Sequence, residues 1–164
     1  MPWNDERDID NVAAILHPIL LGYGETDNEQ YRIFYKNMLK NGCRQLERFM
    51  TPVVSTEAQR KAHEMGVGEL SLYNWNHQRK EMKDDKRSIF HWEHVYPVSS
   101  IANALLGLTN VQIEEITKIL SIADIAWILK SEDRMLNKKG YKSKRPENPW
   151  DAYTDCSIGI ERVI

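Results

Sequence analysis

Residues 88–99 read Ser-Ile-Phe-His-Trp-Glu-His-Val-Tyr-Pro-Val-Ser, and this stretch decides the fold of the second half of the chain. Its alternating pattern, rich in aromatic and β-branched residues, is typical of a β-strand. Pro97 has no backbone N–H to donate, so we predict that the strand ends at this residue. Neighbouring residues of a strand point to opposite faces, and we therefore expect Glu93 and His94 to flank the strand end.

The sequence after Pro97 predicts alternating helices and one more strand. We expect, in order, helices over 99–106 and 111–120, a strand over 125–129 and a helix over 132–139. Ser131 would cap the last helix and Gly140 would end it. The tail from Pro146 onward is predicted to be irregular, with Trp150 and Tyr153 as anchors.

The first half of the chain is predicted to be helical. Apolar residues recur at helical spacing over about 12–21, from 28 to about 50, and over 55–65. Gly22 and Gly24 are expected to end the first helix, Asp27 or Asn28 to cap the second, and Ser55 to open the third. These apolar stripes predict a core or a subunit interface, and they specify no chemistry.

Composition restricts the class of protein only broadly. The chain has 164 residues, 41% of them hydrophobic and 28% charged, which fits one compact domain or a small catalytic module with a helical extension. No apolar run reaches the roughly 18 residues of a membrane-spanning helix, so we expect no membrane partner. The two cysteines, Cys43 and Cys156, are too few for a disulfide framework or a four-cysteine structural zinc. We therefore expect a reducing, cytoplasmic location.

Charge is distributed unevenly along the chain. The net charge is −2, yet residues 130–145 carry a net charge of +5, which leaves −7 for the remainder. The cationic residues of this segment are Lys130, Arg134, Lys138, Lys139, Lys142, Lys144 and Arg145. Such segregation indicates a local face that binds a polyanion, with a solvated helix end and loop as the alternative.

The chemistry that this sequence best supports lies at Glu93 and His94. A carboxylate is a hard oxygen ligand that suits Mg²⁺, and a neutral imidazole can take a proton from water. General-base catalysis of this kind typically contributes about 10²–10⁴-fold to a rate. A metal ion needs a second protein ligand, and Asn137 on the cationic helix offers a neutral carbonyl oxygen.

Two segments together resemble the HNH, or ββα-metal (His-Me finger), nuclease family. Glu93-His94-Val95-Tyr96-Pro97-Val98-Ser99 is similar to the first half of the family motif, and residues 128–140 are similar to its second strand and helix. The acid-His-Asn pattern resembles that of CRISPR effector HNH domains and of phage endonuclease VII. The resemblance implies that Glu93 and Asn137 are metal ligands and that His94 is the general base. It covers about residues 88–145.

The chain departs from the family pattern in several places. Glu93 stands where Asp or His is commoner, and the middle Asn that usually orients the base is missing. Asp124 is the nearest polar residue to that position, and its role stays open. Two extra residues lengthen the approach to Asn137, so Asp133 is a rival ligand. His91 shares a strand face with Glu93 and would be a further ligand, a partner of a ligand, or a hydrogen-bonded strand histidine.

These observations predict an α+β protein with a ββα-metal core. We expect a helical N-terminal region over 1–80, for DNA binding or dimerisation, and a nuclease core with a C-terminal tail over 81–164. The expected activity is Mg²⁺- or Mn²⁺-dependent hydrolysis of DNA phosphodiester bonds, of restriction or phage type, by a homodimer where both strands are cut. The alternatives are a catalytically inactive nucleic-acid-binding ββα module and a helical protein-interaction domain.

Overall fold

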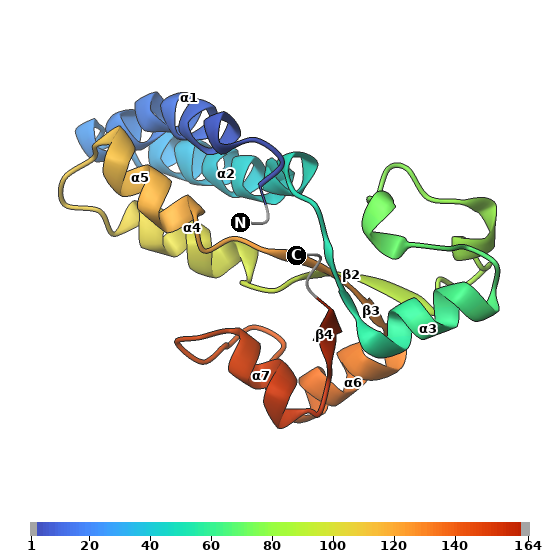
Figure 1. Cartoon of the computed structure of the whole chain (residues 1–164). Coiled ribbons are helices and arrows are strands. Elements are labelled where there is room, and N and C mark those ends of the chain that lie inside the picture. Colours follow the sequence, from blue (N-terminus) through green and yellow to red (C-terminus); the bar gives the residue numbers. More distant parts are fainter. Residues whose placement is uncertain (1–2, 162–164) are drawn as a thin grey trace. The chain divides into compact units, whose positions relative to one another are not determined.

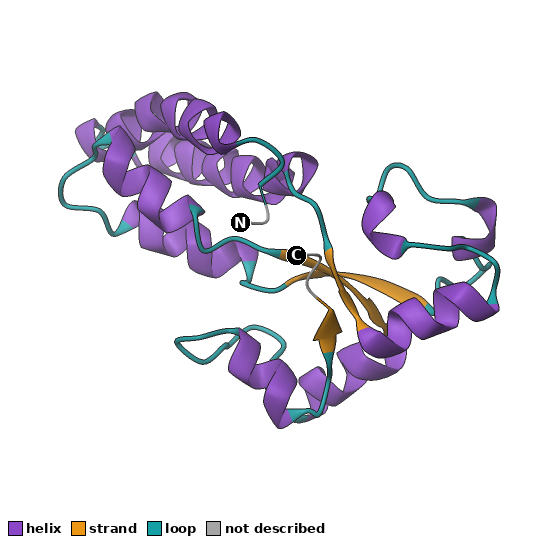
Figure 2. Cartoon of the chain, in the orientation of Figure 1, coloured by secondary structure: helices purple, strands orange, loops and turns teal. Residues whose placement is uncertain are grey.

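The computed structural model describes residues 3–161 and has an α+β architecture (Figures 1 and 2). The helices are α1 (Glu6–Glu25), α2 (Glu29–Gln45), α3 (Thr56–Glu64), α4 (Val98–Leu106), α5 (Ile113–Leu120), α6 (Lys130–Lys138) and α7 (Trp150–Asp155). Three short 3₁₀ helices span Leu46–Phe49, Leu70–Leu72 and Lys80–Met82. The strands are β1 (Val53–Ser55), β2 (Phe90–His94), β3 (Ile125–Leu129) and β4 (Ile160–Glu161).

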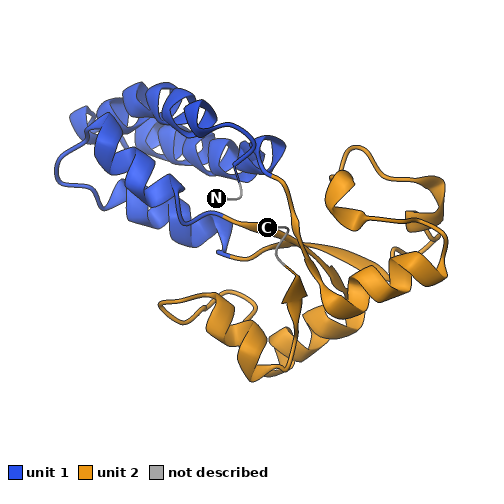
Figure 3. Ribbon diagram, in the orientation of Figure 1, with its two compact units in different colours: residues 1, 3–50, 96–123 blue, residues 2, 51–95, 124–164 orange. Residues whose placement is uncertain are grey.

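The chain divides into two compact units that are both discontinuous in sequence (Figure 3). The first unit holds residues 3–50 and 96–123, and the second holds residues 51–95 and 124–161 of the described chain. The boundaries differ from the predicted division after residue 80. Residues 51–80 belong to the unit with the sheet, while the helices that follow Pro97 belong to the helical unit.

The first unit consists of α1, α2, α4 and α5 around a shared apolar core. Its buried residues include Leu16, Leu39, Leu105 and Leu120, one from each helix. The α1 helix continues through Gly22 and Gly24, which were expected to end it, and its last residue is Glu25. A Cβ at Gly22 would lie 2.5 Å from the Tyr35 ring, so this glycine serves close helix packing.

The second unit is built on one four-stranded sheet with the strand order β2-β3-β1-β4. β3 pairs antiparallel with β2 and parallel with β1, and β4 closes the other edge antiparallel to β1. Both predicted strands are confirmed: β3 has its expected ends, and β2 starts two residues later and ends three residues earlier than expected. The short strand β1 was not predicted, and the tail expected to be irregular contains α7 and β4.

The central strand β3 is buried on both faces, as its run of apolar residues requires. Ala126 and Ile128 pack against Leu136 of α6 and Tyr153 of α7. On the opposite face Trp127 contacts Trp92, with ring centroids 4.6 Å apart, and its indole N–H donates to the Tyr73 carbonyl. This packing fixes α6 against the strand pair that carries Glu93 and His94.

Two caps locate the helices that border the sheet. Ser55 caps α3 as predicted, because its hydroxyl accepts the Ala58 N–H. The predicted cap of α6 is wrong: Ser131 is exposed, and the Glu132 carboxylate instead accepts the Leu129 N–H at 2.7 Å. The α3 helix therefore begins where predicted, whereas α6 begins at Lys130, two residues before its predicted start, and is capped by a different side chain.

Candidate functional site

Strand β2 and helix α6 bring three potential metal ligands together. His91 and Glu93 lie two residues apart on the same face of β2. In the antiparallel pairing with β3, His91 is opposite Ile128 and Glu93 is opposite Ala126. Because α6 begins directly after β3, its first turn carries Asp133 to the same place. One ligand atom from each of His91, Glu93 and Asp133 lies within 4.8 Å of the other two.

The His91 ring has a partner on each of its nitrogens. Nε2 lies 2.9 Å from Oε2 of Glu93 and 3.6 Å from Oδ1 of Asp133. Nδ1 lies 2.9 Å from Nζ of Lys130, the first residue of α6. The side chains of His91, Glu93 and Asp133 are 24%, 12% and 19% exposed, so the cluster is shielded but reachable from solvent.

Arg145 completes the cluster from the segment that follows α6. Its guanidinium pairs with Oε1 of Glu93 and also donates to the backbone carbonyls of Val95 and Tyr141. The Arg145 side chain is only 3% exposed, and it lies over the Tyr153 ring at 5.8 Å. Burial, followed by the negative charge of Glu93, raises the pKa of Tyr153, so its hydroxyl stays protonated.

Asn137 lies one helical turn beyond Asp133 on α6. Its Nδ2 donates to Oδ1 of Asp133 at 3.1 Å, and its side chain is exposed. The structure therefore brings Asn137 to the cluster through Asp133, the rival ligand from the sequence.

His94 is the last residue of β2 and points away from the face that carries Glu93. The residue is half-buried, and its Nε2 is buried. Asp124 lies beside this strand end, because its backbone carbonyl accepts the Val95 N–H at 3.1 Å. The Asp124 carboxylate accepts the Ile125 N–H at 2.9 Å, which turns the chain into β3.

The predicted nucleic-acid-binding residues fall into three groups. Lys130 and Arg145 are engaged inside the cluster. Lys139 forms an ion pair with Asp155 at 3.1 Å. The remaining four are exposed, namely Arg134, Lys138, Lys142 and Lys144.

Two of the three clustered side chains are carboxylates. Glu93 and Asp133 offer carboxylate oxygens, the kind of ligand that Mg²⁺ and Mn²⁺ prefer, and His91 offers a ring nitrogen. Asn137 presents its amide N–H to Asp133. The sequence alone gave no sign that Lys130 and Arg145 contact His91 and Glu93. Strand alternation, however, did place His91 on the face of Glu93.

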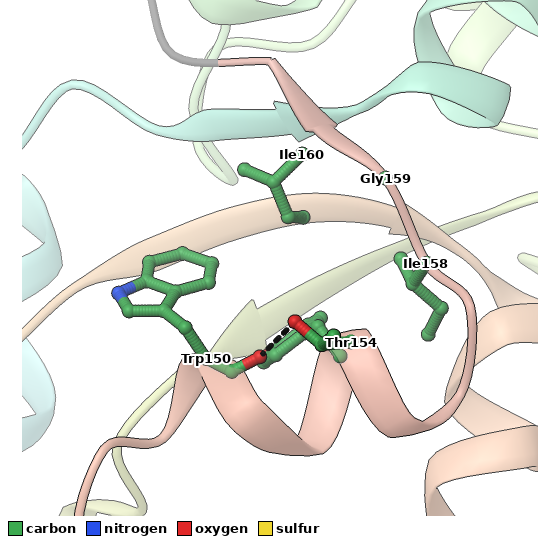
Figure 4. A pocket seen from close by; sticks show the side chains of 6 residues that line it. Trp150, Thr154, Ile158, Gly159 and Ile160 are labelled. Atoms are coloured by element: carbon green, nitrogen blue, oxygen red, sulfur yellow. Dashed lines mark hydrogen bonds between the residues drawn. The ribbon is translucent and has the colours of Figure 1, made fainter.

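A separate cavity of about 270 Å³ lies against α7 (Figure 4). Trp150, Tyr153 and Thr154 of α7 line it together with Ile158, Gly159 and Ile160. The Thr154 hydroxyl donates to the Trp150 carbonyl within the helix, as the dashed line in Figure 4 shows. Tyr153, whose ring also lies against Arg145, is the titratable residue among those lining the cavity.

Comparison of the chain with protein-family models, curated proteins and solved structures gave no match in any of the three. Among the described residues, no helix is both long and apolar enough to cross a membrane.

Proposed function

We propose that this chain is a metal-dependent DNA endonuclease of the HNH type that hydrolyses phosphodiester bonds. The observation that carries the proposal is the convergence of Glu93 from β2 and Asp133 from α6 within one ligand cluster. The order β2, β3, α6, with the two strands antiparallel, supports the assignment of these elements as a ββα-metal core. In that assignment α4 and α5 form an insertion between the two strands.

The proposed roles divide between the two faces of the strand end. His94 would take the proton of the attacking water, and Glu93 would hold a divalent metal ion together with the oxygens of Asp133 and Asn137. Asp124, beside the strand end, orients the segment that carries His94. A divalent cation bound to these oxygens would stabilise the negative charge that develops on the phosphate and on the leaving oxygen.

The exposed cations near the site supply the proposed contacts to DNA. Arg134 and Lys138 project from α6, and Lys142 and Lys144 follow in the next loop. Lysine and arginine side chains at these positions neutralise phosphates and fix the register of a duplex without reading its sequence.

A nuclease with one such site cuts one strand, so we propose that cleavage of both strands involves a homodimer. The helical unit offers an exposed apolar stripe on α2, formed by Tyr31, Phe34 and Met38, which are 61%, 58% and 40% exposed. Aromatic and methionine side chains of this kind are enriched in protein–protein interfaces. Light scattering of the protein on DNA tests the proposal, and a stable monomer that linearises plasmid would contradict it.

Plasmid nicking tests the catalytic proposal directly. We expect the wild type to nick supercoiled plasmid in Mg²⁺ or Mn²⁺ and EDTA to stop the reaction. His94→Ala should lower the rate by about 10²–10⁴-fold, since a general base contributes that much. The matched control is His77→Ala, because His77 is an exposed histidine bonded to Asn74.

The outcomes separate the alternatives. Full activity of His77→Ala with loss of activity in His94→Ala supports the proposed base. Equal cleavage by wild type and His94→Ala refutes that role. DNA binding without cleavage in either metal would instead favour a catalytically inactive binding module, and the absence of binding would favour a protein-interaction domain.

A further inference from the structure

We infer that Lys130, His91, Glu93 and Arg145 form a fixed hydrogen-bonded chain in which His91 donates to Glu93 instead of binding the metal. In this chain Lys130 and Arg145 are positioning residues for Glu93, not contacts to DNA phosphates. The link of this chain to metal binding and cleavage rests on the proposed function. The hydrogen-bonding pattern itself is independent of the proposed function.

Nδ1 of His91 contacts one side chain. Its partner is Nζ of Lys130 at 2.9 Å. A lysine ammonium has three donors and no acceptor, so this contact is a hydrogen bond only if Nδ1 carries a lone pair. Nδ1 of His91 is therefore the acceptor nitrogen of the ring.

Nε2 of His91 lies close to two carboxylate oxygens. Its nearest partner is Oε2 of Glu93 at 2.9 Å, and Oδ1 of Asp133 lies further away at 3.6 Å. An ionised carboxylate can only accept, so Nε2 must carry the hydrogen. Both contacts are satisfied when the ring hydrogen is on Nε2, since the partner of one ring nitrogen sets the state of the other.

If His91 bound a metal ion through Nε2, the ring hydrogen would have to be on Nδ1 instead. Imidazole binds a metal through a lone pair, and a hydrogen on Nδ1 would then point at the ammonium of Lys130. That arrangement places two donors against each other. The proximity of His91 to the two carboxylates therefore reflects a bond to Glu93 and not a third ligand.

Arg145 holds the other oxygen of Glu93. Its guanidinium contacts Oε1 of Glu93, while the remaining bonds go to the Val95 and Tyr141 carbonyls. With only 3% of its side chain exposed, Arg145 is directed inward. Each carboxylate oxygen has a second lone pair, so Glu93 remains able to bind a cation while His91 and Arg145 fix its orientation.

This arrangement predicts what each substitution does. Loss of an outer hydrogen bond to a metal-binding carboxylate typically costs about 10–100-fold in metal affinity or activity. Lys130→Met should release His91 and lower Mn²⁺ affinity within that range, and Lys130→Arg should restore it because a donor to Nδ1 is retained. Lys142→Met is the matched control, since Lys142 is an exposed cation of the same segment.

The decisive experiment is two-bond ¹H–¹⁵N NMR of the histidine rings in metal-free protein at neutral pH. We expect His91 to show a protonated Nε2 and an unprotonated Nδ1 in the wild type and in Lys142→Met, and a mixture of tautomers in Lys130→Met. A protonated Nδ1 or an imidazolium in the wild type would overturn the inference. Because no DNA or metal is present, this result is independent of whether the protein is a nuclease.

Salt dependence of DNA binding gives the second readout. Loss of one phosphate contact lowers the slope of log K against log salt by about 1. We expect this change for Lys142→Met, and an unchanged slope for Lys130→Met and Arg145→Lys. An equal drop in slope for Lys130→Met would make Lys130 a phosphate contact and refute its positioning role.

Discussion

The buried bond between Ser55 and Glu132 offers the sharpest test of how the sheet unit is held together. The Ser55 hydroxyl is fully buried and donates to Oε2 of Glu132 at 2.6 Å, while it accepts the Ala58 N–H that begins α3. The same oxygen of Glu132 accepts the Leu129 N–H that begins α6. One side-chain pair therefore caps two helices that border the strand pair of the candidate site.

The cost of Ser55→Ala follows from these two bonds. Loss of a serine N-cap costs about 1 kcal/mol, and loss of a hydrogen bond to a charged group costs about 1.5–3 kcal/mol. We therefore expect Ser55→Ala to lower the free energy of unfolding by about 3 kcal/mol. Ser131→Ala should change it by less than about 0.5 kcal/mol, because Ser131 is exposed.

Urea unfolding followed by tryptophan fluorescence measures the effect, because Trp75, Trp92, Trp127 and Trp150 all lie in the sheet unit. A double-mutant cycle with Glu132→Gln isolates the pair, and we expect a coupling of about 1–3 kcal/mol. A coupling near zero, or a Ser55→Ala cost equal to that of Ser131→Ala, would refute the reasoning.

The same pair predicts a dependence on pH. Burial raises the pKa of Glu132, and the hydrogen bonds from Leu129 and Ser55 oppose this rise. Since its folded pKa lies above the unfolded value, Glu132 favours the folded state fully at acidic pH and loses this contribution as pH rises through the folded pKa. Ser55→Ala should raise that pKa further. Its cost should therefore be smaller near about pH 4, where a glutamic acid is largely protonated, than at neutral pH.

Two other predictions concern a buried thiol and a helix end. Burial raises the pKa of the Cys43 thiol to about 12. In the Cys156→Ser variant, whose one remaining cysteine is Cys43, we therefore expect this thiol to resist a disulfide reagent at about pH 8 until urea is added. Rapid labelling of the native protein would contradict the burial of Cys43. Gly140 follows α6 with φ +87°, and the Tyr141 N–H donates to the Leu136 carbonyl across it. Gly140→Ala should therefore lower the free energy of unfolding by about 1–2 kcal/mol, and Gly140→Asn should lower it less. Equal melting temperatures of the wild type and Gly140→Ala would argue against a left-handed conformation at this residue.

Local signals in the sequence were sufficient for the elements with strong periodicity or caps. Asn28 and Ser55 cap α2 and α3 as their side chains predict. The strand before Pro97 and the apolar run of β3 were identified for the same reason. Each of these signals lies within a few residues of the element that it specifies.

Elements that depend on distant partners were not predicted. β1 spans three residues and β4 two, so neither shows a period, and both exist through pairing with strands far away in the chain. The cap of α6 was assigned to Ser131 because serine is a preferred cap residue. Glu132 provides the cap instead, and its burial against Ser55 depends on tertiary packing that the local sequence does not encode.

The candidate site shows the same division between local and distant information. Strand alternation placed His91 with Glu93, and helix spacing placed Asn137 one turn from Asp133. The contact of Arg145 with Glu93 joins residues far apart in sequence, so charge counting assigned Arg145 to a DNA-binding face. The tertiary structure therefore changes the interpretation of Arg145 from a DNA contact to a partner of Glu93.

This reassignment changes what the basic segment can do. Of its seven cations, Lys130 and Arg145 are engaged in the cluster and the exposed Lys139 is paired with Asp155, which leaves four exposed cations outside these contacts. With about 0.9 counterions released per phosphate contact, four contacts give a salt slope of about −3.6, whereas seven would give about −6. A measured slope near −6 would mean that the inner cations reach DNA, and the cluster would then have to open on binding. A slope near −3.6 would support a site whose inner charges serve Glu93 alone.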